Sequence, residues 1–193
     1  MKNIALWLVG GIIVIGSIAT IIIFTNKGAN VTNVETGKTV KVKTDGNELA
    51  SVNACDILTP DIAKSILGDT AERGNIQTTQ ATTKEVTVSD CVYTTKIDPG
   101  GKVSISNKKG ANVLVRSAIS SAGAKTNKDQ FGSLKPTGVQ EVSGFGDSAY
   151  YSPEFGQLNI LKGNNWYIIT NYSGTINGTL EADKQLASKL VLK

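Results

Sequence analysis

The segment from Ile4 to Phe24 constrains this chain most, because its 21 residues include no charged side chain. At 1.5 Å per residue, a helix of that length spans about 30 Å, the thickness of the hydrocarbon core of a bilayer. Backbone amides and carbonyls inside lipid must all be hydrogen-bonded, and a helix achieves this within one segment. The sequence therefore predicts a transmembrane signal-anchor helix within residues 1–25.

A cleaved signal peptide is the alternative interpretation of this segment. Ser17-Ile18-Ala19 resembles the small-residue site at which such peptides are cut. Cleavage there would leave the apolar residues 20–24 as the new amino terminus. We therefore favour the uncleaved anchor.

The charges that flank the segment disagree about its orientation. Lys2 and the amino terminus favour a cytoplasmic N-terminus, whereas four lysines follow the segment: Lys27, Lys38, Lys41 and Lys43. The two cysteines of the chain suit an oxidising compartment. We expect a single-pass protein of the cell membrane whose C-terminal domain is extracytoplasmic.

Composition removes several classes of function. The chain contains no histidine, the usual general base near neutral pH and the commonest metal ligand. From Ala50 onward, 15 Lys and Arg stand against 13 Asp and Glu, too even a balance for a nucleic-acid binder. We expect no nucleic-acid partner, no metal, no cofactor and no enzymatic activity. The alternative, a histidine-free hydrolase, is suggested by Ser106-Asn-Lys-Lys109, which matches the bare S-x-x-K pattern.

The rest of the chain divides into a spacer and one domain. Residues 26–50 are rich in Asn, Thr, Gly and Lys, which indicates a flexible spacer. Residues 51–193 predict an α+β domain, with a single antiparallel sheet of about five strands and an N-terminal and a C-terminal helix packed on it. The expected strands are Glu85–Ile97, Ala111–Ile119, Ala149–Ser152, Gln157–Lys162 and Asn165–Tyr172. Apolar side chains on both faces of the last strand indicate a central position.

Capping signals mark the helices. Thr59 is a suitable N-cap, Pro60 a suitable first helical residue and Gly68 a suitable terminator. A second helix is predicted within residues 177–192, where Leu180, Leu186 and Leu190 recur. Residues 74–84 are polar and indicate a loop, and residues 126–134 indicate a brief helix or a loop.

Cys55 and Cys91 are the two cysteines of the chain. A reactive thiol or a redox couple is one interpretation, but neither CxxC spacing nor a neighbouring histidine accompanies them. We favour a structural disulfide that joins the first helix to the first long strand. On the chain-entropy model, closing that loop stabilises the fold by about 4 kcal/mol.

Seven of the nine aromatic residues of the domain lie between Phe145 and Tyr172. Such a cluster is most often the core of a sheet, but it can also form a stacking surface for a sugar or a peptide. On that second interpretation, the ligand-binding residues are Phe145, Tyr150, Tyr151, Trp166 and Tyr167. Strand-like residues follow Gly144-Phe-Gly-Asp147, which favours a glycine turn over a phosphate-binding loop at a helix start.

Three short motifs occur in an order that resembles a known family. A cysteine precedes a Thr-capped helix in Cys55 to Gly68, a Cys-x-Tyr strand follows at Cys91-Val-Tyr93, and Val-Ser-Gly-Phe-Gly-Asp-Ser-Ala-Tyr spans Val142 to Tyr150. The chain from about Ala54 to Lys193 resembles small actinobacterial-type envelope lipoproteins that are grouped as a domain of unknown function. The resemblance implies that the two cysteines pair and that the domain is an α+β sheet with helices. Here the transmembrane anchor takes the place of the lipidated cysteine.

These expectations combine into one functional hypothesis. We expect a membrane-anchored, extracytoplasmic binding or accessory module of the cell envelope. Its partners would be the lipid bilayer and a cell-wall polymer or an envelope protein. The alternative is a sensory or assembly subunit that acts through its membrane helix within a larger complex.

Overall fold

A computed structural model of the chain describes residues 49–74, 81–95, 108–174 and 177–193. The predicted signal-anchor helix and almost all of the predicted spacer lie outside these ranges, so both stay predictions. Within the described part of the chain, no helix is both long enough and apolar enough to cross a membrane.

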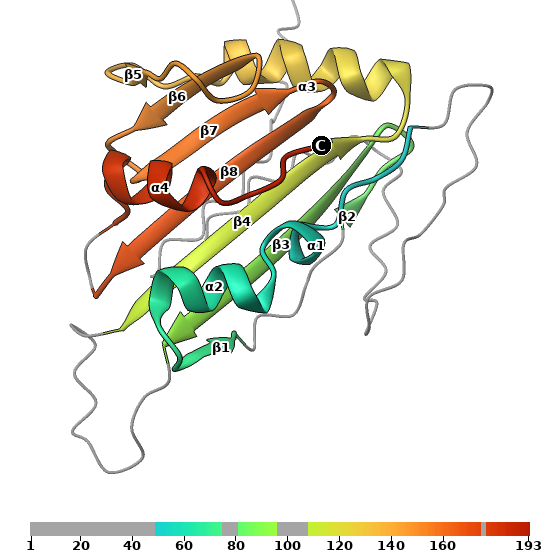
Figure 1. The fold of residues 1–193 in the computed structure, drawn as a ribbon. Helices are drawn as coiled ribbons and strands as arrows, with labels where there is room; N and C mark the ends of the chain where they lie inside the picture. Colours follow the sequence, from blue (N-terminus) through green and yellow to red (C-terminus); the bar gives the residue numbers. More distant parts are fainter. Residues whose placement is uncertain (1–48, 75–80, 96–107, 175–176) are drawn as a thin grey trace, which may run out of the picture. The chain divides into compact units, whose positions relative to one another are not determined.

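The described residues form an α+β domain built on one antiparallel sheet of eight strands (Figure 1). Seven strands lie side by side in the order β1-β3-β4-β8-β7-β6-β5, and β2 pairs with β3 outside this row. The strands are β1 Ala71–Arg73, β2 Ala81–Thr82, β3 Val86–Thr95, β4 Lys109–Ala118, β5 Gln140–Glu141, β6 Ser148–Ser152, β7 Gln157–Lys162 and β8 Asn165–Ser173.

The sheet has three more strands than the sequence predicts. The five expected strands are present as β3, β4, β6, β7 and β8, with small shifts at their ends. The additional strands β1, β2 and β5 contain only two or three residues each, too few for alternation of apolar and polar side chains to appear. One of them, β2, lies in the segment that was expected to be a loop throughout.

The described residues contain four helices: α1 Ala54–Ile57, α2 Pro60–Leu67, α3 Ser121–Ser133 and α4 Leu180–Ala187. Helices α1, α2 and α4 lie on one face of the sheet, and α3 lies on the other (Figure 1). The expected helices at the two ends of the domain are thus confirmed. Residues 126–134 were expected to form a brief helix or a loop, and the helix is confirmed. It is part of α3, which begins several residues earlier.

The capping signals have the expected geometry at α2. Thr59 Oγ1 accepts a hydrogen bond from the Ile62 amide at 3.3 Å, and Gly68 ends the helix with a φ of 92°. The C-terminal helix is shorter than predicted, because Thr179 caps its start and it ends at Ala187. The residues after Ala187 form a turn and an irregular segment.

Alternation of side chains along the strands divides the interior into two cores. The larger core lies between the sheet and helices α1, α2 and α4, and it includes Tyr151, Ile160 and Tyr167. The smaller core lies beneath α3. Trp166 belongs to the smaller core and its neighbour Tyr167 to the larger one. This confirms that β8 is a central strand covered on both faces.

Two buried serines hold the first described residues against the sheet. Ser89 Oγ accepts a hydrogen bond from the Ala54 amide at 2.9 Å and donates one to the Val52 carbonyl at 3.1 Å. Ser117 Oγ accepts a hydrogen bond from the Val52 amide at 3.0 Å. Buried backbone groups require such partners. The segment before α1 is therefore bonded to both β3 and β4.

Candidate functional site

The two cysteines form a disulfide that joins α1 to β3. The Sγ atoms of Cys55 and Cys91 are 2.12 Å apart, and their Cα atoms are 5.1 Å apart. Cys91 is buried, whereas Cys55 is half-buried and its Sγ accepts a hydrogen bond from Nη2 of Arg73 at 3.1 Å. The predicted structural disulfide is confirmed, and the described residues contain no free cysteine.

The structure separates the five candidate aromatic residues instead of gathering them on one surface. Tyr150 and Trp166 lie beneath α3, where their rings contact that of Phe131 at centroid distances of 5.0 and 5.7 Å. Tyr151 and Tyr167 lie in the larger core on the opposite face of the sheet. These four residues are therefore parts of the two cores. The fifth, Phe145, is half-buried and reaches the surface.

The polar atoms of Tyr151 and Trp166 have hydrogen-bond partners within the domain. The Tyr151 hydroxyl donates a hydrogen bond to the Gly178 carbonyl at 2.6 Å, and Trp166 Nε1 donates one to Asn159 Oδ1 at 3.0 Å. Burial raises the pKa of Tyr150 to about 12, so its hydroxyl stays protonated at neutral pH. These side chains stabilise the fold and do not supply a general base.

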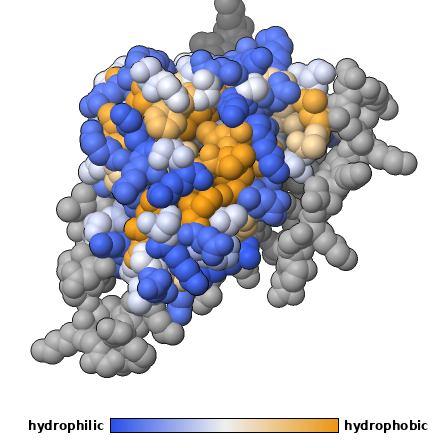
Figure 2. All heavy atoms as spheres, in the orientation of Figure 1, coloured by the Kyte–Doolittle hydropathy of each residue, from blue (hydrophilic) through white to orange (hydrophobic). Residues whose placement is uncertain are grey.

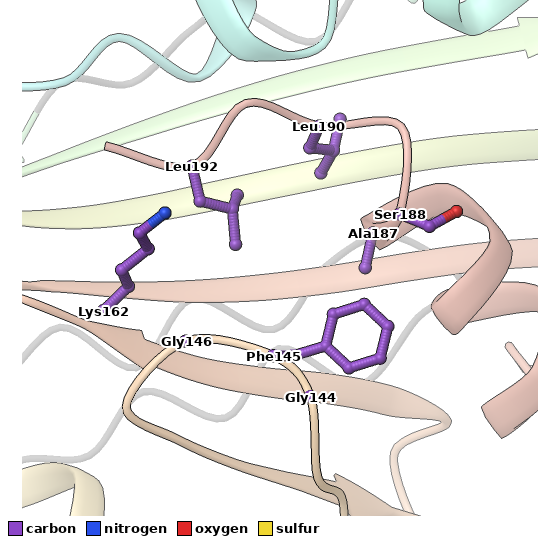
Figure 3. A pocket seen from close by; sticks show the side chains of 8 residues that line it. All are labelled: Gly144, Phe145, Gly146, Lys162, Ala187, Ser188, Leu190 and Leu192. Carbon is purple, nitrogen blue, oxygen red and sulfur yellow. The ribbon is translucent and has the colours of Figure 1, made fainter.

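Phe145 lies in the wall of a surface groove (Figure 3). The groove has a volume of about 330 Å³, and the space-filling view of the same face shows apolar side chains gathered between polar areas (Figure 2). One wall is the turn before β6, and the other is the end of α4 with the segment after it. The lining residues are Gly144, Phe145, Gly146, Lys162, Ala187, Ser188, Leu190 and Leu192.

The turn that carries Phe145 is fixed to the β7–β8 hairpin. Gly146 has a φ of 58°, and a Cβ atom there would lie 2.4 Å from the Leu161 carbonyl oxygen. Asp147 Oδ2 accepts a hydrogen bond from the Gly163 amide at 2.7 Å, and the Asp147 amide donates one to Leu161 at 2.8 Å. Strand β6 follows this turn. The expected glycine turn is confirmed, and it presents Phe145 to the groove.

The opposite wall is the segment after α4. Leu190 and Leu192 pack against the larger core. Asn165 Nδ2 donates a hydrogen bond to the Lys193 carbonyl at 3.1 Å, and the Tyr167 hydroxyl accepts one from the Lys193 amide at 3.1 Å. The sequence predicts these leucines on a helix, whereas they lie in the turn and the irregular segment that follow α4, so the wall is not predicted. The available signal was two leucines two positions apart, a spacing typical of an extended segment.

Helix α4 also carries a fully buried carboxyl group, that of Asp183. Its Oδ1 accepts a hydrogen bond from the Asn171 amide at 2.6 Å, and its Oδ2 has no hydrogen-bond partner among the described residues. Burial raises the pKa of Asp183 to about 8, although the amides of Asn171 and Leu158 oppose this shift. The side chain is therefore mainly protonated at neutral pH, and it fastens α4 to β8.

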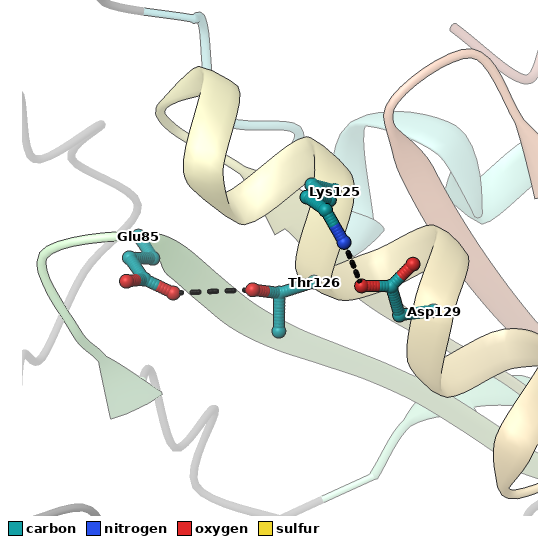
Figure 4. Close-up of polar contacts among 4 residues, drawn as sticks. All are labelled: Glu85, Lys125, Thr126 and Asp129. Atoms are coloured by element: carbon teal, nitrogen blue, oxygen red, sulfur yellow. Dashed lines mark hydrogen bonds and ion pairs between the residues drawn. The ribbon is translucent and has the colours of Figure 1, made fainter.

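A second group of polar contacts lies where α3 meets the start of β3 (Figure 4). Thr126 Oγ1 donates a hydrogen bond to Glu85 Oε2 at 3.2 Å, and Lys125 Nζ lies 2.5 Å from Asp129 Oδ2. The Lys125 and Asp129 side chains are 78% and 60% exposed, and pairs of this kind contribute only a few tenths of a kcal/mol. These contacts position the helix, and nothing in them points to a ligand.

In the ranges that the structure covers, no group of three or more Cys, Asp or Glu side chains is placed to hold a metal ion. Ser106 of the S-x-x-K pattern lies outside those ranges, and Lys109 begins β4. Most of the side chains that line the groove are apolar, and one carries an amine, that of Lys162.

Comparisons with known proteins found no match for the chain. No family model matches it, and neither does any curated protein or solved structure. The resemblance to envelope lipoproteins therefore stays a prediction.

Proposed function

We propose that this chain is a membrane-tethered, extracytoplasmic binding module of the cell envelope, and that the groove beside Phe145 is its binding site. The groove is the observation on which the proposal depends: its volume is about 330 Å³, and four of the side chains in its lining are apolar, those of Phe145, Ala187, Leu190 and Leu192. Ligand sites commonly combine such a lining with a few polar groups that orient the ligand. We infer a binding role without catalysis.

Two other features support the proposed location. The uncharged segment from Ile4 to Phe24 is long enough to span a bilayer as a helix. The Cys55–Cys91 disulfide is of a kind that persists in oxidising compartments and is rare in the cytosol. Both features favour an anchor in the cytoplasmic membrane with the domain outside.

Photo-crosslinking of the full chain in intact cells tests the proposal. A benzophenone-bearing amino acid replaces Ser188 in the groove, and the same amino acid replaces the exposed Lys128 of α3 as a matched control. We expect a discrete crosslinked species from position 188 and none from position 128. In the same cells, an impermeant biotin reagent that reacts with lysines should label the domain from outside.

Two results would overturn the proposal. Identical crosslinking from positions 188 and 128 would show that the groove has no specific occupant. Labelling of the domain only after the cells are lysed would place it in the cytoplasm.

An assembly subunit is the second candidate function, and one observation favours it. Phe155, in the turn between β6 and β7, is 48% exposed, which is unusual for a large aromatic side chain. Exposed aromatic residues are frequent anchors of protein interfaces. A benzophenone amino acid at position 155 would then crosslink to a single membrane protein in fixed stoichiometry. Absence of such a product would remove this candidate.

A further inference from the structure

Lys162 is the charged residue of the groove lining. Its side chain extends from the end of β7 toward Leu192 (Figure 3). The lining includes no carboxylate, and within the described residues none forms an ion pair with Lys162. An ammonium group without a counter-ion beside an apolar surface favours an anionic ligand group.

Two more lysines make the surroundings of the groove positive. Lys189 and Lys193 flank the two groove leucines in sequence, and both are exposed. Asp147 contributes a carboxylate in the turn of the opposite wall, but it is engaged by the Gly163 amide. With the terminal carboxylate of Lys193 counted as well, three ammonium groups stand against two carboxylates, an excess that favours an anion at this end of the domain.

The groove offers few polar groups besides Lys162. The Ser188 hydroxyl already donates a hydrogen bond to the Gln185 carbonyl at 2.8 Å. A sugar or a peptide bound here would have to form its hydrogen bonds mainly with backbone groups of the lining, since the lining has only two polar side chains. An aliphatic chain has no such requirement.

The size of the groove favours a small ligand. Its volume of about 330 Å³ corresponds to roughly ten water molecules at about 30 Å³ each, which is room for a short aliphatic chain. Its eight lining residues are far fewer than the roughly 20–30 per side of a standard protein interface. A small molecule therefore fits the groove better than a protein surface does.

If the groove is a binding site, as proposed above, we infer that it holds the aliphatic chain of an anionic amphiphile. The chain lies between Phe145 and Leu192, and Lys162 binds the acidic head group. Both walls are fixed by contacts within the domain, the first by Asp147 on Gly163 and the second by Asn165 on Lys193. Binding then orders little of the protein, which favours affinity.

The test uses the full chain in discs of phosphatidylcholine, with dodecanoate that carries a diazirine near the chain end as the probe. After photolysis and digestion, we expect label on residues 144–147 or 188–193, and unlabelled dodecanoate should remove it. Dodecanol keeps the chain without the charge, and acetate keeps the charge without the chain. Each should compete at least about tenfold more weakly than dodecanoate, which corresponds to a difference of about 1.4 kcal/mol in binding free energy.

Matched variants examine the head-group contact. Lys162→Glu should weaken dodecanoate binding by about tenfold or more, and Lys162→Arg should retain it. Lys128→Glu changes the same charge on α3, across the sheet, and should leave binding unchanged. Equal competition by dodecanol and dodecanoate would overturn the proposal that the ligand has an anionic head group. Equal binding by the Lys162→Glu and Lys128→Glu variants would also overturn it.

Separate outcomes apply to the proposed function and to the ligand class. If dodecanoate does not label the groove but position 188 still crosslinks in cells, the ligand class is wrong and the binding function stands. If both experiments fail, the groove is not a binding site. Where dodecanoate does label the groove, discs that contain an anionic phospholipid identify the source: suppressed labelling indicates a membrane lipid, and unchanged labelling indicates a free amphiphile.

Discussion

The carboxylate of Asp147 accepts a hydrogen bond from the backbone amide of Gly163 at 2.7 Å, and so fastens one wall of the groove to the β7–β8 hairpin. We expect Asp147→Ala to lower the free energy of unfolding by about 1 kcal/mol, because the side chain is exposed and water replaces part of the lost interaction. Asp147→Asn keeps an oxygen acceptor and should stay within a few tenths of a kcal/mol of the native chain. Urea unfolding measures both, and equal losses would contradict the assigned role of this bond.

Alanine substitutions at Gly144 and Gly146 separate the energetic cost of a positive φ angle from the cost of steric overlap in this turn. Both have positive φ angles, 85° and 58°. No atom lies within 4 Å of a Cβ at Gly144, whereas the Leu161 carbonyl oxygen lies 2.4 Å from one at Gly146. Gly144→Ala should therefore cost about 1–2 kcal/mol for the backbone conformation alone, and Gly146→Ala should cost clearly more. Comparable melting temperatures for the two variants would show that the close approach is unimportant.

Reduction of the disulfide should destabilise the domain. Cys55 and Cys91 are separated by 36 residues, for which the chain-entropy model gives about 4 kcal/mol. Thermal unfolding with and without reductant measures the difference, and the Cys55→Ser, Cys91→Ser double variant should reproduce the reduced melt. Reductant should have no further effect on that variant. Equal melting temperatures for the oxidised and reduced native chain would refute the prediction.

Asp183 should make stability fall as pH rises. Its pKa is raised from 3.8 to about 8 by burial, so between these values the unfolded chain releases the proton while the folded chain keeps it. The contribution of this group is most favourable below pH 3.8, declines up to about pH 8 and is constant above that.

Asp183→Asn tests this pH dependence, because asparagine keeps an acceptor for the Asn171 amide and does not ionise. The variant should melt at about the native temperature near pH 4 and above it near pH 8. Melting temperatures of the variant and the native chain, recorded between pH 4 and pH 8, measure this difference. A difference that does not grow with pH would show that the carboxyl group is not held protonated.

The predictable parts of this fold are those specified within one element. Thr59 caps α2 through the amide of Ile62, three residues away, and the two apolar faces of β8 can be seen directly in its alternation. Neither feature depends on a distant part of the chain. Local patterns therefore sufficed to predict the helix and the central strand.

Helix α3 shows why its own sequence did not decide between helix and loop. Asn127, on its inner face, is fully buried, and its Nδ2 donates hydrogen bonds to the carbonyls of Arg116 at 3.0 Å and Asn164 at 2.8 Å. A polar residue thus occupies a position that is normally apolar, and the helical period of apolar side chains disappears. Its partners lie on other elements, so the sequence alone does not reveal the role.

The groove was not predictable for a related reason. Phe145 is a candidate because of its place in an aromatic cluster, but the opposite wall is formed by Leu190 and Leu192, more than forty positions later. Their approach depends on the anchoring of Lys193 by Asn165. Only the packed domain brings these segments together.

The bonding of the first described residues determines how this domain bears a mechanical load. A pull on the chain ahead of Leu49 acts first on the hydrogen bond from the Leu49 amide to the Ile119 carbonyl, and then on those that Ser89 and Ser117 make to Val52. Once these yield, the disulfide passes the tension from Cys55 directly to Cys91 in β3, so the stretch of chain between the two cysteines is not extended. A covalent bond, and not the packing of α2, then carries the load.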